Sequence, residues 1–322
     1  MNQAAGVLGL LLLLTVLTFG FALGSGSEGP GFFPSFGIGQ PPAAAQLELI
    51  GQLRLPRALS AFAVGGLLAL AGLLMQVMLR NPLGDPYILG VSGGAAFTVM
   101  LSMLLGVPAA WLSGGAFAGA LISMLAVFAL ARGTGPMDSN RLLLTGVVMA
   151  SGWAALVSLV LALSPATRLP GMLFWLMGDL SDADSPAGPL LLLAFGTLVA
   201  LALSRSLDLL QSGELQAAAL GVTVGRLRTL VFLLGSLLTA GAVTSAGAVG
   251  FVGLVAPHIF RLLGGASHRL LIPGSMLLGG CLLLFADTLA RTLAAPTQLP
   301  VGVITALLGV PLFLYLLNRG RG

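Results

Sequence analysis

The stretch ALSAFAVGGLLALAGLLMQVML at residues 58–79 decides the fold. It carries no charged side chain, and its length matches the roughly 20 apolar residues that cross a bilayer as one helix. A helix satisfies its backbone hydrogen bonds internally, which hydrocarbon requires. The stretch therefore predicts a transmembrane helix.

The whole chain has the composition of such a stretch. Of its 322 residues, 57% are hydrophobic and only 7% are charged, whereas soluble domains carry about 25% charged residues. A soluble protein of this size would have too few charges to cover its surface, but a surface that faces lipid needs none. We therefore expect an all-α, polytopic membrane protein whose residues 1–322 form a single transmembrane domain.

Ten apolar runs are long enough to predict spans, so the chain is expected to have about ten transmembrane helices. The seventh and eighth runs are separated only by the weak break Ala246-Gly247-Ala248, which leaves their boundaries open. The ten runs cover residues 7–23, 58–79, 88–107, 112–131, 142–163, 189–204, 229–246, 248–263, 271–289 and 300–317.

The positions of the arginines predict the orientation, because cytoplasmic loops carry the excess of basic residues. The chain has 14 basic residues, all of them arginine. With ten spans and a cytoplasmic N-terminus, ten arginines are cytoplasmic and four are external; merging spans seven and eight would divide them equally. We therefore expect ten spans with both termini cytoplasmic. Because the arginines occur singly or in pairs at span ends, they indicate topology and not a nucleic-acid partner. The external four are Arg54, Arg57, Arg168 and Arg291.

Two segments outside the spans are long. Residues 24–57 form an external segment rich in Gly, Pro and Ser, and residues 205–228 form the longest cytoplasmic loop. In that loop, Ser212 is suited to cap a short helix with Glu214 in its first turn, and Gly221 is suited to end it. We expect a short helix on the cytoplasmic face.

The sequence lacks the common motifs of catalysis and energy conversion. It has no lysine for a phosphate-binding loop, and its two histidines, His258 and His268, do not form a His-Glu-x-x-His pair. Nearly every charge lies at a span end; Asp287 is the exception, and it can reach either water or Arg291 four residues on. These absences favour a non-enzymatic passage powered by another subunit.

Several motifs follow one another in a fixed order and resemble the FecCD family, the permease subunits of ABC importers for iron–siderophores, haem and cobalamin. The resemblance covers about residue 50 to the C-terminus. The motifs are LRLPR at 53–57, GGLLA at 65–69, RNPLGDP at 80–86, LGVSGGA at 89–95, RLLLTG at 141–146, WLMG at 175–178, FVGLVAPH at 251–258, Ala286-Asp287 with Arg291, and LPVGVIT at 299–305.

The resemblance implies the type II ABC importer permease fold, in a homodimer in the bacterial inner membrane. It implies two cytoplasmic ATP-binding subunits and an external or periplasmic substrate-binding protein. This chain would bind no cofactor or metal, because ATP and Mg belong to the partner ATPase. Iron–siderophore is the first expectation for the cargo, followed by haem and cobalamin. The alternatives are an ATPase-independent secondary transporter and an ABC zinc or manganese permease.

The resemblance also implies roles for the external arginines. Arg54, Arg57 and Arg291 match positions that face acidic residues of the binding protein in the cobalamin permease. Arginine–carboxylate pairs are oriented and set register. The alternative is that these side chains snorkel to lipid headgroups.

On the cytoplasmic side, the resemblance implies two further sets of residues, for which plain capping and turn roles are the alternatives. Helix packing is the preferred role for His258, which follows Pro257 in an apolar span. The predicted ATPase-coupling residues are Gly213, Glu214, Leu215, Ala217, Ala218, Ala219, Leu220 and Gly221, and the predicted cytoplasmic gate is Asn81, Leu83, Ser139 and Asn140.

Overall fold

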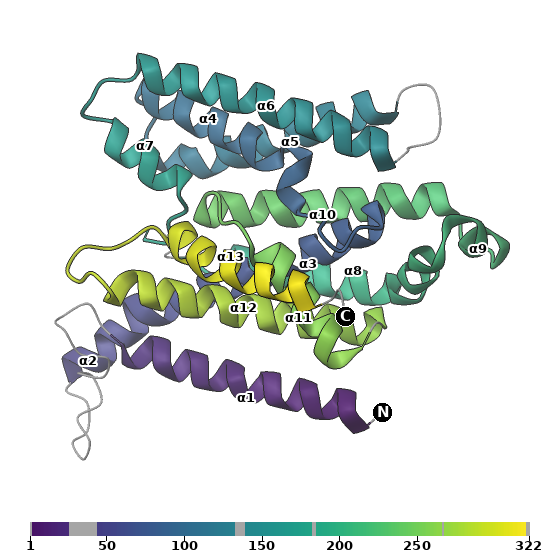
Figure 1. Cartoon of the computed structure of the whole chain (residues 1–322). Coiled ribbons are helices and arrows are strands. Elements are labelled where there is room, and N and C mark those ends of the chain that lie inside the picture. Colours follow the sequence, from purple (N-terminus) through teal and green to yellow (C-terminus); the bar gives the residue numbers. More distant parts are fainter. Residues whose placement is uncertain (1, 26–43, 133–138, 182–184, 266, 320–322) are drawn as a thin grey trace.

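The computed structural model describes residues 2–25, 44–132, 139–181, 185–265 and 267–319, which form a bundle of helices with no β-strand among them (Figure 1). Each of the ten predicted spans corresponds to one apolar helix, so the all-α polytopic fold is confirmed. The seven long helices are α1 Asn2–Gly24, α3 Leu55–Leu79, α5 Leu112–Arg132, α6 Ser139–Leu163, α8 Ala187–Ser212, α10 Val224–Ala246 and α12 His268–Thr292. The three shorter ones are α4 Val91–Leu105, α11 Val252–Gly264 and α13 Val301–Arg319.

Short helical segments connect the ten. The helix α2, Ala44–Leu49, continues through a π-helical turn at Ile50–Arg54 into α3, so residues 44–57 of the predicted external segment are helical. A 3-10 turn at Pro86–Leu89 precedes α4, and another at Ala109–Trp111 precedes α5. The helices α7, Leu169–Leu176, and α9, Glu214–Ala219, lie between longer ones. The prediction of spans did not include α7.

Several predicted boundaries are corrected. The sixth span was expected to end at residue 204 and the seventh to begin at residue 229, but α8 continues to Ser212 and α10 begins at Val224. The predicted cytoplasmic loop 205–228 is therefore shortened to residues 213–223, which include α9. The Ser212 hydroxyl donates to the Asp208 carbonyl within α8, so Ser212 does not cap the next helix as expected; Gly213 occupies the N-cap position of α9. Spans seven and eight are separate helices, because Gly247 adopts φ +64° and ends α10.

The helix α3 lies at the centre of the bundle and packs against α8, α10, α11 and α12. Two glycines let these backbones approach closely, as small residues do in membrane proteins. A Cβ atom at Gly72 would overlap the Gly253 carbonyl of α11, and one at Gly65 would overlap the Gly279 carbonyl of α12. Glycine at these positions therefore determines how closely α11 and α12 pack on α3.

Buried or partly buried non-helical backbone occurs at residues 178–180 and 247–251. The helix α11 is about 20 Å long, shorter than the roughly 30 Å hydrocarbon core, so it cannot cross that core without adjoining non-helical backbone. Hydrocarbon leaves no water for such backbone, which must pair within the protein. Asp179 N–H donates to the Ala246 carbonyl at 2.9 Å, and Val301 N–H donates to the Gly178 carbonyl at 3.0 Å. Val249 N–H donates to the Tyr87 hydroxyl at 3.1 Å.

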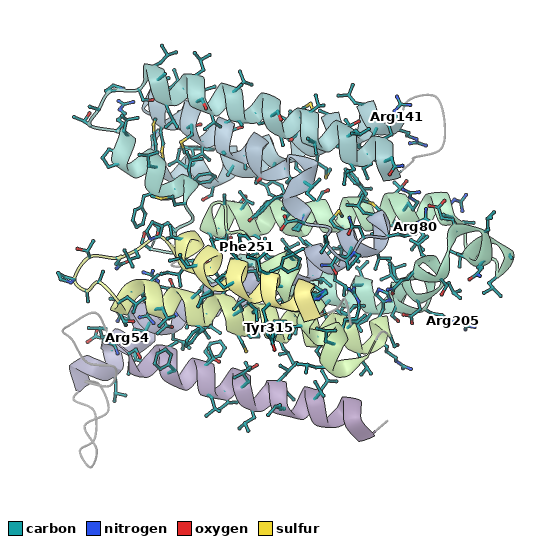
Figure 2. All side chains as sticks on the ribbon, viewed as in Figure 1. Arg54, Arg80, Arg141, Arg205, Phe251 and Tyr315 are labelled. Atoms are coloured by element: carbon teal, nitrogen blue, oxygen red, sulfur yellow. The ribbon has the colours of Figure 1, made fainter. Side chains whose placement is uncertain are left out.

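The bundle has two polar ends, which we name by the short helices they carry. At the α2 end lie α2 and Arg54, and at the α9 end lie α9, Arg80, Arg141 and Arg205 (Figures 1 and 2). The helix α1 begins and α13 ends at the α9 end (Figure 1). Because the first helix starts and the last helix ends on the same side, the chain crosses the bundle an even number of times. Between the two ends, the outer helices expose large apolar side chains, as a lipid-facing surface does.

Candidate functional site

Two predicted docking arginines at the α2 end meet at one buried carboxylate, Asp287 of α12. Arg57, in the first turn of α3, donates to Asp287 from Nη2 at 2.8 Å and from Nε at 3.1 Å. Arg291, one turn beyond Asp287, holds its Nε 3.4 Å from the second carboxylate oxygen. Asp287 is only 1% exposed. The alternative that it reaches water is therefore wrong, and its contact with Arg291 is confirmed.

Both arginines have further partners in the chain. Arg57 donates to the Gln298 side chain at 3.2 Å, and Arg291 donates to the Ala22 carbonyl at the end of α1 at 2.9 Å. A single carboxylate faces two guanidinium groups, so this Asp287 cluster carries a net charge of about +1. Because a buried charge needs its partners, the cluster fastens α1, α3 and α12 together. An acidic partner that approaches Arg57 or Arg291 has to share them with Asp287.

Arg54 is held differently from the other two arginines. It lies in the π-helical turn, and its Nη1 donates to the Leu23 carbonyl of α1 at 3.0 Å. The structure places all three predicted docking arginines at the α2 end, with Arg291 buried and Arg54 and Arg57 partly exposed. Their role in docking stays a prediction.

At the α9 end, the predicted coupling segment forms a short helix between two glycines. Gly213 and Gly221 adopt φ +133° and +85°, a region that favours glycine. Glu214 lies in the first turn, where its charge favours the helix, as predicted. Gly221 N–H donates to the Ala218 carbonyl at 3.0 Å and closes the segment.

The exposed face of α9 is narrower than the predicted small-residue face. Ala217 is buried against the chain, so it does not belong to the outer surface, whereas Ala218 and Ala219 are exposed. Leu215 is 89% exposed and Leu220 is 66% exposed. Two largely exposed leucines at a polar end leave an apolar surface that a protein partner can cover.

Glu214 joins α9 to two other elements. Its carboxylate accepts a hydrogen bond from Arg228 of α10 at 2.7 Å and lies 3.3 Å from Nη2 of Arg80. Arg80 directly follows α3 and adopts the left-handed conformation with φ 48°. We call Arg80, Glu214 and Arg228 the Glu214 cluster. It connects the predicted coupling helix to the turn that carries the first predicted gate residues.

That turn, residues 81–85, is held by its own side chains. The Asn81 side chain accepts a hydrogen bond from Leu83 N–H at 2.9 Å, and the Asn81 carbonyl accepts one from Gly84 N–H at 2.9 Å. Asn81 and Leu83 are both exposed at the α9 end. Asp85 accepts from Tyr87 N–H at 2.7 Å; burial raises the pKa of the Asp85 carboxyl, and this hydrogen bond lowers it by a smaller amount. These hydrogen bonds hold the turn in one conformation.

The second predicted gate pair begins α6. Ser139 and Asn140 are the first two residues of that helix, and the Asn140 side chain is exposed. The preceding Asp138 lies outside the described residues. Both predicted pairs therefore belong to the end of the bundle that carries α9, and their role as a gate stays a prediction.

Two histidines have structural contacts. The His258 ring packs edge-on against Phe313 of α13, with 6.0 Å between ring centroids, in line with the preferred packing role. His268 begins α12, and both its N–H and its Nδ1 lie within 2.8 Å of an Asp208 carboxylate oxygen on α8. Sequence reasoning missed this pair and the Glu214 cluster. Sixty positions separate Asp208 from His268 in the chain, and no local pattern joins them.

Relatives with similar sequences are permeases. The chain is 42% identical over 286 residues to the cobalamin import system permease protein BtuC of Halobacterium salinarum, an alignment that covers 88% of this chain and 76% of that protein. It is 40% identical over 329 residues to the hemin transport system permease protein HmuU of Yersinia pestis, with 98% and 96% covered.

Solved structures agree with these relatives. An inward-facing metal-chelate type ABC transporter superposes with a TM-score of 0.89 at 34% identity and covers 98% of this chain and 99% of that one. PsaBC from Streptococcus pneumoniae shares the fold more distantly, with a TM-score of 0.57 at 20% identity over 84% of this chain and 93% of that one. The FecCD transport family matches residues 10–319, nearly the whole sequence. The ordered motifs, the ten apolar helices and these matches agree, and the chain belongs to the FecCD transport family.

Proposed function

We propose that this chain is the membrane-spanning permease subunit of an ATP-binding cassette importer that carries a large metal chelate across the membrane. The observation that carries the proposal is the FecCD match over residues 10–319, together with relatives named for cobalamin and hemin transport. A secondary transporter is not favoured, because the relatives are import-system permeases. A zinc or manganese permease is not favoured either, because the relatives at 42% and 40% identity are named for cobalamin and hemin transport.

The proposed orientation places the α9 end in the cytoplasm of a bacterial inner membrane, with both termini on that side. The distribution of arginines supports this orientation, because Arg80, Arg141 and Arg205 lie at the α9 end, opposite Arg54 (Figure 2). The α2 end then faces outward. A substrate-binding protein docks there, and acidic side chains of that protein meet Arg54 and Arg57.

The α9 end meets the ATPase subunits. Leu215 and Ala218 of α9 and Leu220 directly after it offer them an exposed apolar surface. Two copies of the permease form the pathway, and each contacts one ATP-binding subunit, which holds the ATP and Mg. This chain then supplies motion and a path and performs no bond-breaking chemistry of its own.

The Glu214 cluster connects α9 to the predicted gate, so a displacement of α9 can reach the gate. When the partner subunits close on ATP, α9 is displaced, and Glu214 pulls on Arg80 and Arg228. Arg80 directly precedes the Asn81–Leu83 turn, so the displacement reaches the predicted gate through one ion pair and one peptide bond. ATP binding then shifts the population between outward-open and inward-open forms.

The experiment that tests the function is uptake in proteoliposomes. The permease is reconstituted with its partner ATPase and binding protein, and cobalamin, haemin and a ferric siderophore are offered side by side. Cobalamin and haemin head the comparison because the relatives are named for them, and a ferric siderophore was the first expectation from the sequence. ATP-dependent uptake of one chelate supports the proposal. Uptake that continues with a hydrolysis-deficient ATPase subunit, or no uptake of any of the three, rejects it.

A further inference from the structure

A groove of about 520 Å³ lies at the α9 end, between the last turns of α8, the segment after α9 and the first turns of α10. Its walls combine leucine side chains with two arginines, a serine and a threonine. Its lining includes Leu220 and Gly221 of the predicted coupling segment, but no residue of the Glu214 cluster or of the turn at residues 81–85. The lining residues that matter below are Arg205, Ser206, Leu209, Thr223, Arg226 and Leu230.

Each arginine ends an exposed apolar stripe on its helix. On α8, Leu191, Phe195 and Leu198 are 72%, 52% and 69% exposed. They follow one another at helical spacing, and the same spacing continues through residue 202 to Arg205. Phe195 precedes Arg205 by ten residues, about 15 Å along the helix, which is half the thickness of the hydrocarbon core.

On α10 the order in the sequence is reversed, because the arginine comes first and the exposed leucines follow it. Arg226 is followed by Leu230 and Leu233, which are 52% and 37% exposed, again at intervals of four and three residues. Two apolar tracks therefore run from the bilayer interior to the groove, and each ends at an arginine. A molecule with two acyl chains and one anionic headgroup has this form.

The charge of the groove is not neutralised by its neighbours. Arg205 and Arg226 are exposed, and neither forms an ion pair within the described ranges of the chain. The two carboxylates of this region have other partners: Asp208 lies against His268, and Glu214 lies against Arg228 and Arg80. The groove therefore presents two guanidinium groups to an outside anion.

We propose that this groove binds an anionic phospholipid, with its phosphate between Arg205 and Arg226 and its acyl chains along the two stripes. Basic pockets between transmembrane helices are suited to such headgroups. The Ser206 and Thr223 hydroxyls line the same groove and add donors. Ordinary snorkelling would place each arginine at the interface independently, whereas here two helices bring two arginines to one hollow. The site does not depend on the cargo.

Lipid binding to the purified permease tests the site. Native mass spectrometry and thermal unfolding are measured while dioleoyl phosphatidylglycerol or dioleoyl phosphatidylcholine is added in detergent. The test variant is Arg205→Gln/Arg226→Gln, and the matched control is Arg132→Gln/Arg269→Gln, which removes two exposed arginines of the same end outside the groove. An inorganic phosphate arm separates a lipid site from a simple anion site.

We expect wild-type and control protein to bind phosphatidylglycerol in preference to phosphatidylcholine. The test variant should bind it about thirtyfold more weakly, and each single substitution about fivefold more weakly, as two arginines near an anionic headgroup would produce. If the double variant fails to fold, the single variants decide. Unchanged binding in the test variant, equal loss in the control, or equal stabilisation by inorganic phosphate overturns the proposal. So does loss of the partner ATPase from the test variant in lipid-free detergent, which would make the groove a protein contact.

Discussion

Replacing Glu214 with glutamine tests the link between α9 and the Asn81–Leu83 turn. The substitution keeps the size of the side chain and one acceptor oxygen but removes the charge that faces two arginines. Arg228 is the more sensitive partner, because its side chain is 6% exposed and lies 2.7 Å from the carboxylate. Arg80 is 48% exposed and lies 3.3 Å away.

The two contacts of Glu214 contribute different amounts to the free energy of unfolding. A hydrogen bond to a charged group contributes about 1.5–3 kcal/mol when buried. Because Glu214 is itself 36% exposed, we take the lower part of that range for Arg228. The Arg80 pair is largely solvated and contributes about 0.5 kcal/mol. We therefore expect Glu214→Gln to lower the free energy of unfolding by about 2 kcal/mol, and Arg80→Gln by about 0.5 kcal/mol.

The functional effects should not follow the stability effects. Both variants cut the connection between α9 and the turn, so both should hydrolyse ATP in the assembled importer with less cargo moved per ATP. The assay measures uptake and phosphate release in the same proteoliposomes, and thermal unfolding is followed in parallel. Arg132→Gln, an exposed arginine of the same end, is the control. If the Arg80→Gln variant moved as much cargo per ATP as the wild type, the reasoning would be refuted. This variant is the decisive one because it removes only the contact between Arg80 and Glu214 and leaves the contact between Arg228 and Glu214 intact.

Three shorter predictions concern other parts of the molecule. Arg54→Glu should reduce stimulation of the ATPase by the binding protein while the melting temperature stays within about 2 °C of wild type, since Arg54 lies outside the Asp287 cluster; full stimulation would contradict the docking prediction. Gly72→Ala should destabilise the permease by about 2–3 kcal/mol in denaturation measurements, because its Cβ overlaps the backbone of α11. Gly152→Ala, which has open space around it, should be near neutral, and equal effects would reject the packing argument. Asp208→Asn should cost about 1 kcal/mol by weakening the contact with His268 at the start of α12, and an unchanged melting temperature would show that this contact contributes nothing.

The helices were predictable because the residue types at their ends differ from the apolar residues within them. Apolar runs in this chain end at arginines, prolines or glycines, and hydrocarbon imposes the helix on whatever lies between. The prediction of a helix end failed where charged and apolar residues occur together. The last turns of α8 contain Arg205 and Asp208, so they resemble a loop in sequence, but they are helical because Asp208 pairs with His268 and Leu207 and Leu210 are buried.

The candidate sites were predictable only in part. The arginines at span ends stood out because charge is scarce, but their partners did not. Asp287 lies 230 positions from Arg57 in the chain, and Arg228 lies 14 from Glu214. Pairing at such distances depends on which helices pack together, and on α3 that packing depends on glycines whose contacts no sequence period reveals. For the same reason, the sequence does not reveal that Arg291, one of the predicted docking arginines, is largely buried.

The helix α3 begins at one charge cluster and ends at the other. Arg57 in its first turn binds Asp287, and Arg80 directly after its last turn meets Glu214. The helix between them is buried along most of its length and is about 37 Å long, so it can transmit a displacement as a rigid rod. A double-mutant cycle of Arg57→Gln and Arg80→Gln tests this idea. At about 35 Å separation their effects on stability should add to within about 0.5 kcal/mol. If α3 transmits motion, the two substitutions should not be additive in their effects on binding-protein-stimulated ATPase activity. Expressed as free energies, the effect of the double variant should differ from the sum of the two single effects by more than about 0.5 kcal/mol. Additive effects in both measurements would mean that the two ends act independently and that α3 only supports them.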